Sequence, residues 1–143
     1  MEITAFDLAQ RYVGIHELAG AQLNHPLIAW WLSLCGYPTT VTDETPWCSA
    51  FVNGIHWELR LPRSKSAAAR SWLKVGIPVM PVDARIGDVV VLRRGTNPAL
   101  GHVGFLAGRR VGSDIVSVLG GNQGDGVSIR DFPLSDVISM QRF

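Results

Sequence analysis

The chain has 143 residues, of which 47% are hydrophobic and 17% charged, and its formal net charge is +1. A chain of this length and composition is typical of one globular domain with a substantial core and argues against intrinsic disorder. A net charge near zero argues against strong attraction to nucleic acid or to an acidic membrane surface. We therefore expect a single domain over residues 1–143 that binds no nucleic acid.

The first ten residues, M-E-I-T-A-F-D-L-A-Q, lack the basic and long apolar regions of a secretory signal peptide. The longest apolar stretch, residues 26–34, is far shorter than the roughly 20 residues that span a bilayer. We expect a protein made in the cytoplasm without a signal peptide and without membrane insertion. A substrate outside the membrane would then require release or delivery of the protein.

Helical periodicity occupies the first half of the chain, and short strand-like segments occupy the second half. Helices are predicted over residues 5–13, 26–34, 47–59 and 66–75. Strands are predicted over residues 88–93, 102–107, 115–119, 127–132 and 137–141, separated by Gly, Asn, Asp or Pro. Helices followed by closely spaced strands indicate an α+β domain in which N-terminal helices pack on a C-terminal antiparallel sheet.

One of the two cysteines, Cys48, is predicted in the first turn of a helix. Thr45 is a suitable N-cap residue and Pro46 suits the first helical position. The helix dipole and free N–H groups there favour a thiolate and can bind an oxyanion, whereas the nearby Glu44 opposes ionisation. A cysteine on an apolar helix stripe is more often simply buried, and Cys35, which lacks a helix-start signal, is interpreted as such.

The histidine most able to serve this cysteine lies in the segment G-H-V-G-F. Strand alternation places His102, Gly104 and Leu106 on one face of the strand. The next predicted strand ends in L-G-G-N-Q, so that pairing of the two strands would bring Asn122 or Gln123 near His102, where an amide oxygen could orient the imidazole. Each segment alone is compatible with a surface histidine and an ordinary glycine-rich turn.

The remaining candidates for chemistry are weaker. His56 follows the cysteine by eight residues on the same predicted helix, too far to act as its base. Glu17 could line a cleft. The two cysteines are too few for a disulfide scaffold, and a reduced pair is favoured over a single bridge. No His, Cys or acidic residues have the spacing of a structural zinc site, so we expect neither a metal nor another cofactor.

Five segments in a fixed order carry a resemblance: P-W-C-S-A-F-V-N, A-R-S-W-L, G-D-V-V-V-L, G-H-V-G-F and L-G-G-N-Q. Together they resemble the NlpC-type and CHAP cysteine peptidases and amidases. The similarity is strongest to short single-domain cell-wall hydrolases of phage lysis cassettes (endolysins) and prophages, and it covers nearly the whole chain from Gly14. One departure is R-I-G-D at residues 85–88, where the family more often has Pro-Gly-Asp.

The resemblance implies a papain-like fold and a peptidoglycan hydrolase that cuts an amide bond of the cell wall. It makes Cys48 the nucleophile, His102 the base and Asn122 the third catalytic residue, with Gln123 as the alternative. Four residues are predicted near the substrate cleft: Glu17, Glu44, Trp47 and Gly101. The expected partner is bacterial peptidoglycan, bound by a monomer.

The expected reaction is acyl transfer through a thioester on the cysteine, followed by hydrolysis. The sequence leaves open whether the bond cut is the sugar-to-L-Ala amide or one within the stem peptide. It also leaves open a delivered antibacterial amidase toxin, an acyltransferase of the same fold, and a non-catalytic module that binds cell-wall peptide.

Overall fold

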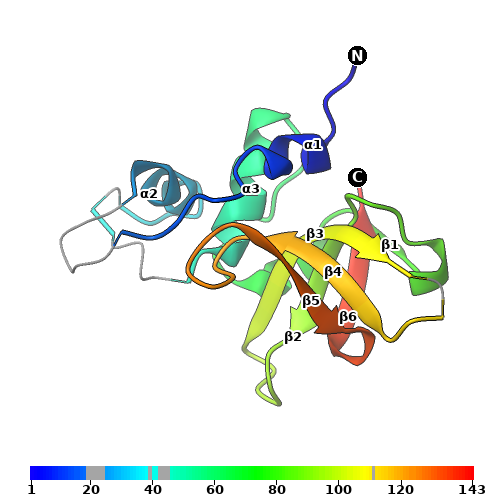
Figure 1. Cartoon of the computed structure of the whole chain (residues 1–143). Coiled ribbons are helices and arrows are strands. Elements are labelled where there is room, and N and C mark those ends of the chain that lie inside the picture. The colour runs from blue at the N-terminus through cyan, green and yellow to red at the C-terminus, as the bar shows by residue number, and fades with distance from the viewer. Residues whose placement is uncertain (19–24, 39, 42–45, 111) are drawn as a thin grey trace.

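The computed structural model describes residues 1–18, 25–38, 40–41, 46–110 and 112–143. Three α-helices come first, α1 (Ala5–Gln10), α2 (Pro26–Ser33) and α3 (Cys48–Glu58), followed by a 3-10 helix, η1 (Ala69–Lys74). The helices lie on one side of the molecule and the strands on the other (Figure 1). The predicted α+β class, with N-terminal helices on a C-terminal antiparallel sheet, is confirmed.

The sheet has six strands in the order β1-β6-β2-β3-β4-β5, and every neighbouring pair is antiparallel. Their bounds are β1 Ile77–Val79, β2 Val89–Arg93, β3 Gly101–Arg109, β4 Ile115–Gly120, β5 Ser128–Pro133 and β6 Val137–Arg142. Strand β1 was not predicted. It has three residues, includes Pro78 and lies at the edge of the sheet, where a missing N–H is tolerated.

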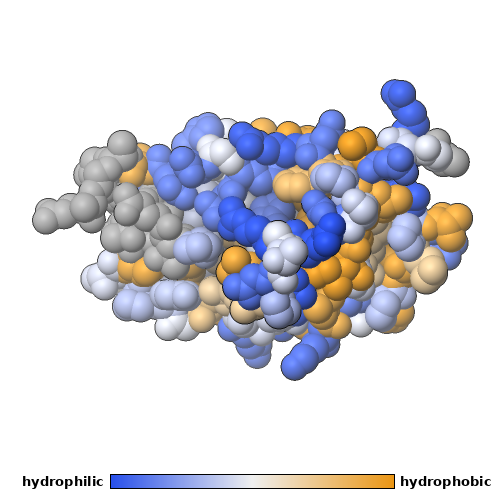
Figure 2. Space-filling model, turned by 90° about the horizontal axis from the view of Figure 1, so that it is seen from below, coloured by the Kyte–Doolittle hydropathy of each residue, from blue (hydrophilic) through white to orange (hydrophobic). Residues whose placement is uncertain are grey.

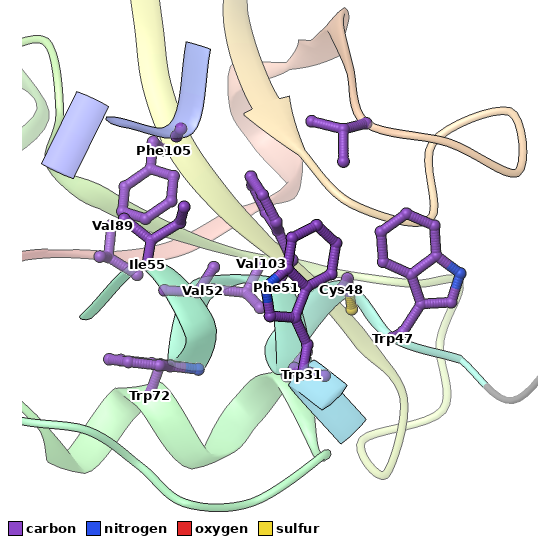
Figure 3. Packing of buried hydrophobic residues seen from close by; sticks show 14 of the residues in the cluster. Trp31, Trp47, Cys48, Phe51, Val52, Ile55, Trp72, Val89, Val103 and Phe105 are labelled. Carbon is purple, nitrogen blue, oxygen red and sulfur yellow. The ribbon is translucent and has the colours of Figure 1, made fainter. Parts of the chain in front are cut away.

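Helix α3 supplies most of the helical side of the core. Its residues Phe51, Val52 and Ile55 are fully buried, and they lie against Val103 and Phe105 of β3 in the main hydrophobic cluster (Figure 3). The opposite face of β3 contributes to a second cluster, with Leu92, Leu106, Val116, Val118 and Met140. Viewed from below, the surface shows hydrophilic side chains in its middle beside an apolar area (Figure 2).

A glycine inside α3 allows a close contact between two helices. A Cβ atom on Gly54 would collide with the indole ring of Trp31, which belongs to α2 and is fully buried. Glycine in a helix interior costs about 1 kcal/mol relative to alanine. The close approach of Trp31 offsets this cost through the large apolar surface that an indole buries.

The start of α3 differs from the prediction. The helix begins at Cys48, and its N-cap is Trp47, which makes no side-chain capping bond. Pro46 therefore precedes the helix, while the predicted cap Thr45 lies outside the described residues. The cysteine is still in the first turn, now as the first helical residue.

The predicted helix over residues 66–75 is also shorter than expected. Asn53 Oδ1 accepts the backbone N–H of Lys65, and Ser49 Oγ donates to the carbonyl of Ser66. Ala68 is extended, with φ −73° and ψ 124°. Side chains of α3 thus compete for this backbone, and only η1 becomes helical.

Asp88, in the segment G-D-V-V-V-L, anchors the start of β2 to β6. Its carboxylate accepts two bonds from Arg142 of β6, of 2.9 and 2.7 Å, and a third from the backbone N–H of Arg85. The aspartate is 4% exposed. A buried carboxylate needs such pairing, so this residue joins the two strands and has a structural role.

Acidification should destabilise the protein through His56. Its ring is 1% exposed and contacts Trp72, Phe105 and Phe143, and burial lowers the pKa of the imidazole from 6.5 to about 4. Because the folded pKa lies below the unfolded one, this contribution is fully present above pH 6.5 and is lost as the pH falls toward 4. The loss is about 3 kcal/mol, measurable as a fall in the urea unfolding midpoint.

His56→Phe is the matched variant, because it removes the titration and keeps an aromatic ring. It also removes the 2.8 Å bond between Nδ1 and the carbonyl of Pro62, which lowers stability at every pH. The variant should show a flatter pH dependence than the wild type. His102, which is half-buried and also has a lowered pKa, contributes equally to both proteins, so identical slopes would contradict the assignment to His56.

Candidate active site

Cys48 lies at the end of the core cluster occupied by Trp47, away from Trp72 and Phe105 (Figure 3). Its side chain is 6% exposed. Backbone N–H groups of Val103, Ser49 and Cys48 itself are directed at the thiol, and each lowers its pKa. Val103 follows His102 in the chain, so the cysteine lies at the same end of β3 as the histidine.

The predicted preference for a thiolate is wrong for the protein at rest. Burial raises the pKa of the Cys48 thiol, and this effect exceeds the lowering by the backbone donors and by the positive charge of Arg94. Desolvation in a core position penalises a charged sulfur more than one helix end can compensate. At rest the Cys48 side chain is therefore a thiol, which would need a base to ionise.

The imidazole of His102 is held by Gln123. The two side chains share a hydrogen bond of 2.8 Å between Nε2 of the histidine and Oε1 of the glutamine. The amide nitrogen of Gln123 donates to the backbone carbonyls of Val118, at 3.2 Å, and Ser128, at 2.8 Å. A reversed amide would point its oxygen at these two carbonyl oxygens, so the oxygen must face the histidine.

This arrangement fixes the tautomer of His102. An amide oxygen accepts only, so Nε2 must carry the hydrogen and Nδ1 of the neutral ring keeps its lone pair. Burial lowers the pKa of the imidazole and outweighs the opposing effect of the bond to Gln123, while Arg94 lowers it further. At neutral pH the ring is a neutral base with one nitrogen free to accept a proton.

Two successive glycines at the end of β4 make room on both faces of the sheet. A Cβ on Gly120 would lie 2.7 Å from Gln123 Oε1 and 3.3 Å from His102 Nε2. A Cβ on Gly121 would lie 2.5 Å from the Trp47 ring. The L-G-G-N-Q segment thus separates the histidine and its amide on one face from the start of α3 on the other.

The thiol and the imidazole approach this strand end from opposite faces. Val103 belongs to the helix-side cluster, and alternation places His102 on the other face, where its ring stacks on Phe132 at 5.3 Å. Among the hydrogen bonds of the described residues, none joins Cys48 to His102. Catalytic hydrogen bonds are often long or poorly aligned in a free enzyme and tighten when the substrate binds.

Asn122, which the family resemblance favours as the third residue, has a different position. Its backbone is left-handed, with φ 57°, and it lines a pocket together with His102. The bond to the imidazole comes from its neighbour Gln123, which is 5% exposed. β3 and β4 do pair as neighbours, as the site prediction required.

The residues predicted near the cleft have varied positions. Trp47 is fully buried and donates its indole N–H to Glu17 Oε1 at 2.7 Å, so it packs in the core and does not line a cleft. Glu17 is half-buried, and its backbone N–H bonds Asp125 of the glycine-rich loop. A Cβ on Gly101 would meet Arg70, 3.2 Å away. Glu44 lies outside the described residues.

Metal ligation and membrane insertion are two further properties that bear on function. In the parts of the chain that the structure describes, no group of three or more His, Cys, Asp or Glu side chains could hold a metal ion. Within those same residues, no helix has the length and apolar character needed to cross a bilayer.

Comparisons with known proteins give an informative likeness among solved structures. No protein-family model matches the chain, and no curated protein matches it significantly. A solved structure, the NlpC/p60 domain of the peptidoglycan hydrolase SagA, is similar with a TM-score of 0.53 and 12% identity, covering 98% of this chain and 97% of that one. At this identity the likeness shows the fold, and the predicted papain-like α+β architecture is confirmed.

Replacing Gln123 should release the tautomer of His102. In ¹⁵N-labelled protein, the wild type should give the imidazole signals of an Nε2-protonated ring, because only that form donates to Oε1. Gln123→Leu should give a mixture of tautomers. It should also cost about 1–3 kcal/mol in unfolding experiments, because two carbonyl oxygens lose their donor.

Asn122→Ala is the control, since it removes the neighbouring amide and keeps the bonded one. It should leave the tautomer unchanged. If the tautomer changes in Asn122→Ala and stays fixed in Gln123→Leu, the orienting role belongs to Asn122.

Proposed function

We propose that the chain is an NlpC/p60-type cysteine hydrolase that cuts an amide bond in the peptide of bacterial peptidoglycan. The observation that carries the proposal is the hydrogen bond between His102 and Gln123, at the strand end where the next backbone N–H reaches the Cys48 thiol. The same architecture occurs in a domain of the peptidoglycan hydrolase SagA, and this likeness supports peptidoglycan as the proposed substrate class.

The first half of the proposed reaction is acylation of Cys48. As the substrate binds, the thiol passes its proton to Nδ1 of His102, and the sulfur attacks the carbonyl carbon of the amide. Backbone N–H groups at the start of α3 are free of helical partners and can stabilise the negative oxygen. The imidazolium then gives its proton to the leaving nitrogen as the C–N bond breaks.

Hydrolysis of the thioester completes the cycle. His102, neutral again, removes a proton from water, which attacks the thioester carbonyl, and the sulfur leaves with a proton from the imidazolium. Gln123 keeps Nε2–H bonded throughout both halves, so that Nδ1 alone exchanges protons. This role makes Gln123 our proposed third residue in place of Asn122.

The domain organisation, the oligomeric state and the biological role are also proposals. We infer a single catalytic domain over residues 1–143 that acts as a monomer without a cofactor. Its role resembles that of a phage endolysin, which is made in the host cytoplasm and acts on the wall after release or delivery. The bond could be the sugar-to-L-Ala amide or one within the stem peptide, and mass analysis of digested peptidoglycan for new amino ends distinguishes the two.

Cys48→Ala should abolish the release of peptides from purified peptidoglycan, a loss of at least 1000-fold, because no other group forms the thioester. Cys35→Ala is the matched control: Cys35 is half-buried, burial raises its pKa to about 11, and it has no part in the proposed reaction. Acid-quenched mixtures should contain wild-type protein heavier by the acyl fragment, with the added mass on Cys48.

The thermal stability of Cys48→Ala should remain close to that of the wild type. Undiminished digestion by this variant would exclude the proposed function. Absence of digestion by the wild type under every condition tested would favour a peptide-binding module.

The acid limb of the pH profile of kcat/KM should lie below the usual pKa range of histidine. The rate requires a neutral imidazole, and burial lowers the pKa of His102 beneath 6.5. We therefore expect the acid limb of the profile to have its midpoint below pH 6.5. Gln123→Leu should move that limb further down, because the lost bond had raised the pKa. A midpoint above 6.5 in the wild type would contradict this environment for the base.

A further inference from the structure

A pocket opens beside His102 on the face of the sheet that points away from the helices. Its walls include Arg94 after β2, Gln123 in the glycine-rich loop, and Arg130 and Phe132 on β5. The stacked ring of Phe132 forms its apolar part. The proposed acid–base residue thus borders a pocket to which the proposed reaction assigns no role.

Most of the charge in this pocket is positive and unpaired. Arg93 is bonded to Asp136 at 2.9 Å, which neutralises both groups. Asp131 accepts the hydroxyl of Ser117 at 2.6 Å, and the alternation of β5 places it on the opposite face from Arg130. Among the described residues, no ion pair involves Arg94 or Arg130.

Arg94 and Arg130, the two arginines without an ion pair, line the same pocket as His102. A Cβ on Gly124 would collide with Nη2 of Arg130, so this guanidinium rests on the loop that carries Gln123. The charge of Arg94 is close enough to influence both Cys48 and His102. The β2–β3 connection that follows Arg94 forms the lower tip of the molecule in Figure 1, and Figure 2 looks onto that side.

The proposed chemistry decides which part of a substrate would reach this pocket. His102 donates its proton to the leaving nitrogen, so atoms that lie beyond His102 belong to the leaving fragment. Guanidinium groups bind carboxylates through paired, charge-assisted hydrogen bonds. An unpaired guanidinium next to the leaving nitrogen is therefore suited to a carboxylate of the amino acid that leaves.

We propose that Arg94 and Arg130 bind a carboxylate on the leaving amino acid and so select substrates in which that group is free rather than amidated. The inference rests on the proposed function, because it uses the direction of the reaction, and it applies to a bond within the stem peptide. It adds two specificity-determining residues and names the substrate class as amides whose leaving amino acid is anionic.

The test compares two synthetic stem peptides that differ only in a carboxylate or a carboxamide on the leaving amino acid. For the wild type, kcat/KM should be roughly 10- to 100-fold higher for the carboxylate, as expected for a charge-assisted bond. In Arg94→Gln and Arg130→Gln the ratio should fall toward one, mainly through KM. The ratio is the measured quantity because Arg94 also affects the ionisation of the catalytic pair, an effect common to both peptides.

Arg93→Gln is the matched control, since its guanidinium lines the same pocket but is already bonded to Asp136. It should keep the wild-type ratio. If the ratio falls equally in Arg93→Gln, a general positive potential is responsible and the assignment is overturned. Equal cleavage of both peptides by the wild type would also overturn it. In the latter case the proposed hydrolase function would stand.

A binding measurement keeps the test independent of turnover. Cys48→Ala protein, which cannot cleave them, is titrated with the carboxylate or the carboxamide stem peptide while the ¹⁵N signals of the arginine Nε–H groups are followed. The carboxylate peptide should shift the signals of Arg94 and Arg130, and the carboxamide peptide should leave them in place. No difference between the two compounds would overturn the inference even if the wild type digests peptidoglycan.

Discussion

The arrangement of this site depends on the buried side-chain amide of Gln123, whose two N–H hydrogens are both donated to backbone carbonyls. Gln123 donates to two backbone carbonyls, so its oxygen has a fixed direction and can only accept from the imidazole. That constraint sets which nitrogen of His102 carries the hydrogen. In the proposed reaction, a neutral ring with one defined lone pair would be ready for proton transfer before substrate binds, which avoids the cost of reorienting it.

Burial also explains why the Cys48 thiol and the His102 imidazole are both uncharged at rest. It raises the pKa of the Cys48 thiol and lowers that of the His102 imidazole, so each moves away from an ion pair. The helix end and Arg94 act against this trend at the cysteine only in part. In the proposed reaction the thiolate would form as the proton moves to the histidine, and the surrounding donors would then stabilise it.

The main elements of the fold and the neighbours of His102 could be predicted from sequence patterns. Apolar periodicity located α3 and the central strands, because it reflects which faces are buried. The glycine-rich segment was placed beside His102 because consecutive strands usually pair. Choosing between Asn122 and Gln123 required the backbone of the turn, since a left-handed residue at 122 redirects both side chains. The desolvation of Cys48 depends on contacts from Trp47 and Val103, which no local pattern specifies.

The two glycines at the end of β4 make room for the side chains around His102 and around the start of α3. A side chain at Gly120 would enter the space shared by Gln123 and His102, and one at Gly121 would displace Trp47 from the start of α3. Since neighbouring strand residues face opposite sides, a pair of glycines leaves room on both sides at once. The glycine pair therefore leaves space for the Gln123–His102 hydrogen bond on one side and for Trp47, which precedes Cys48, on the other.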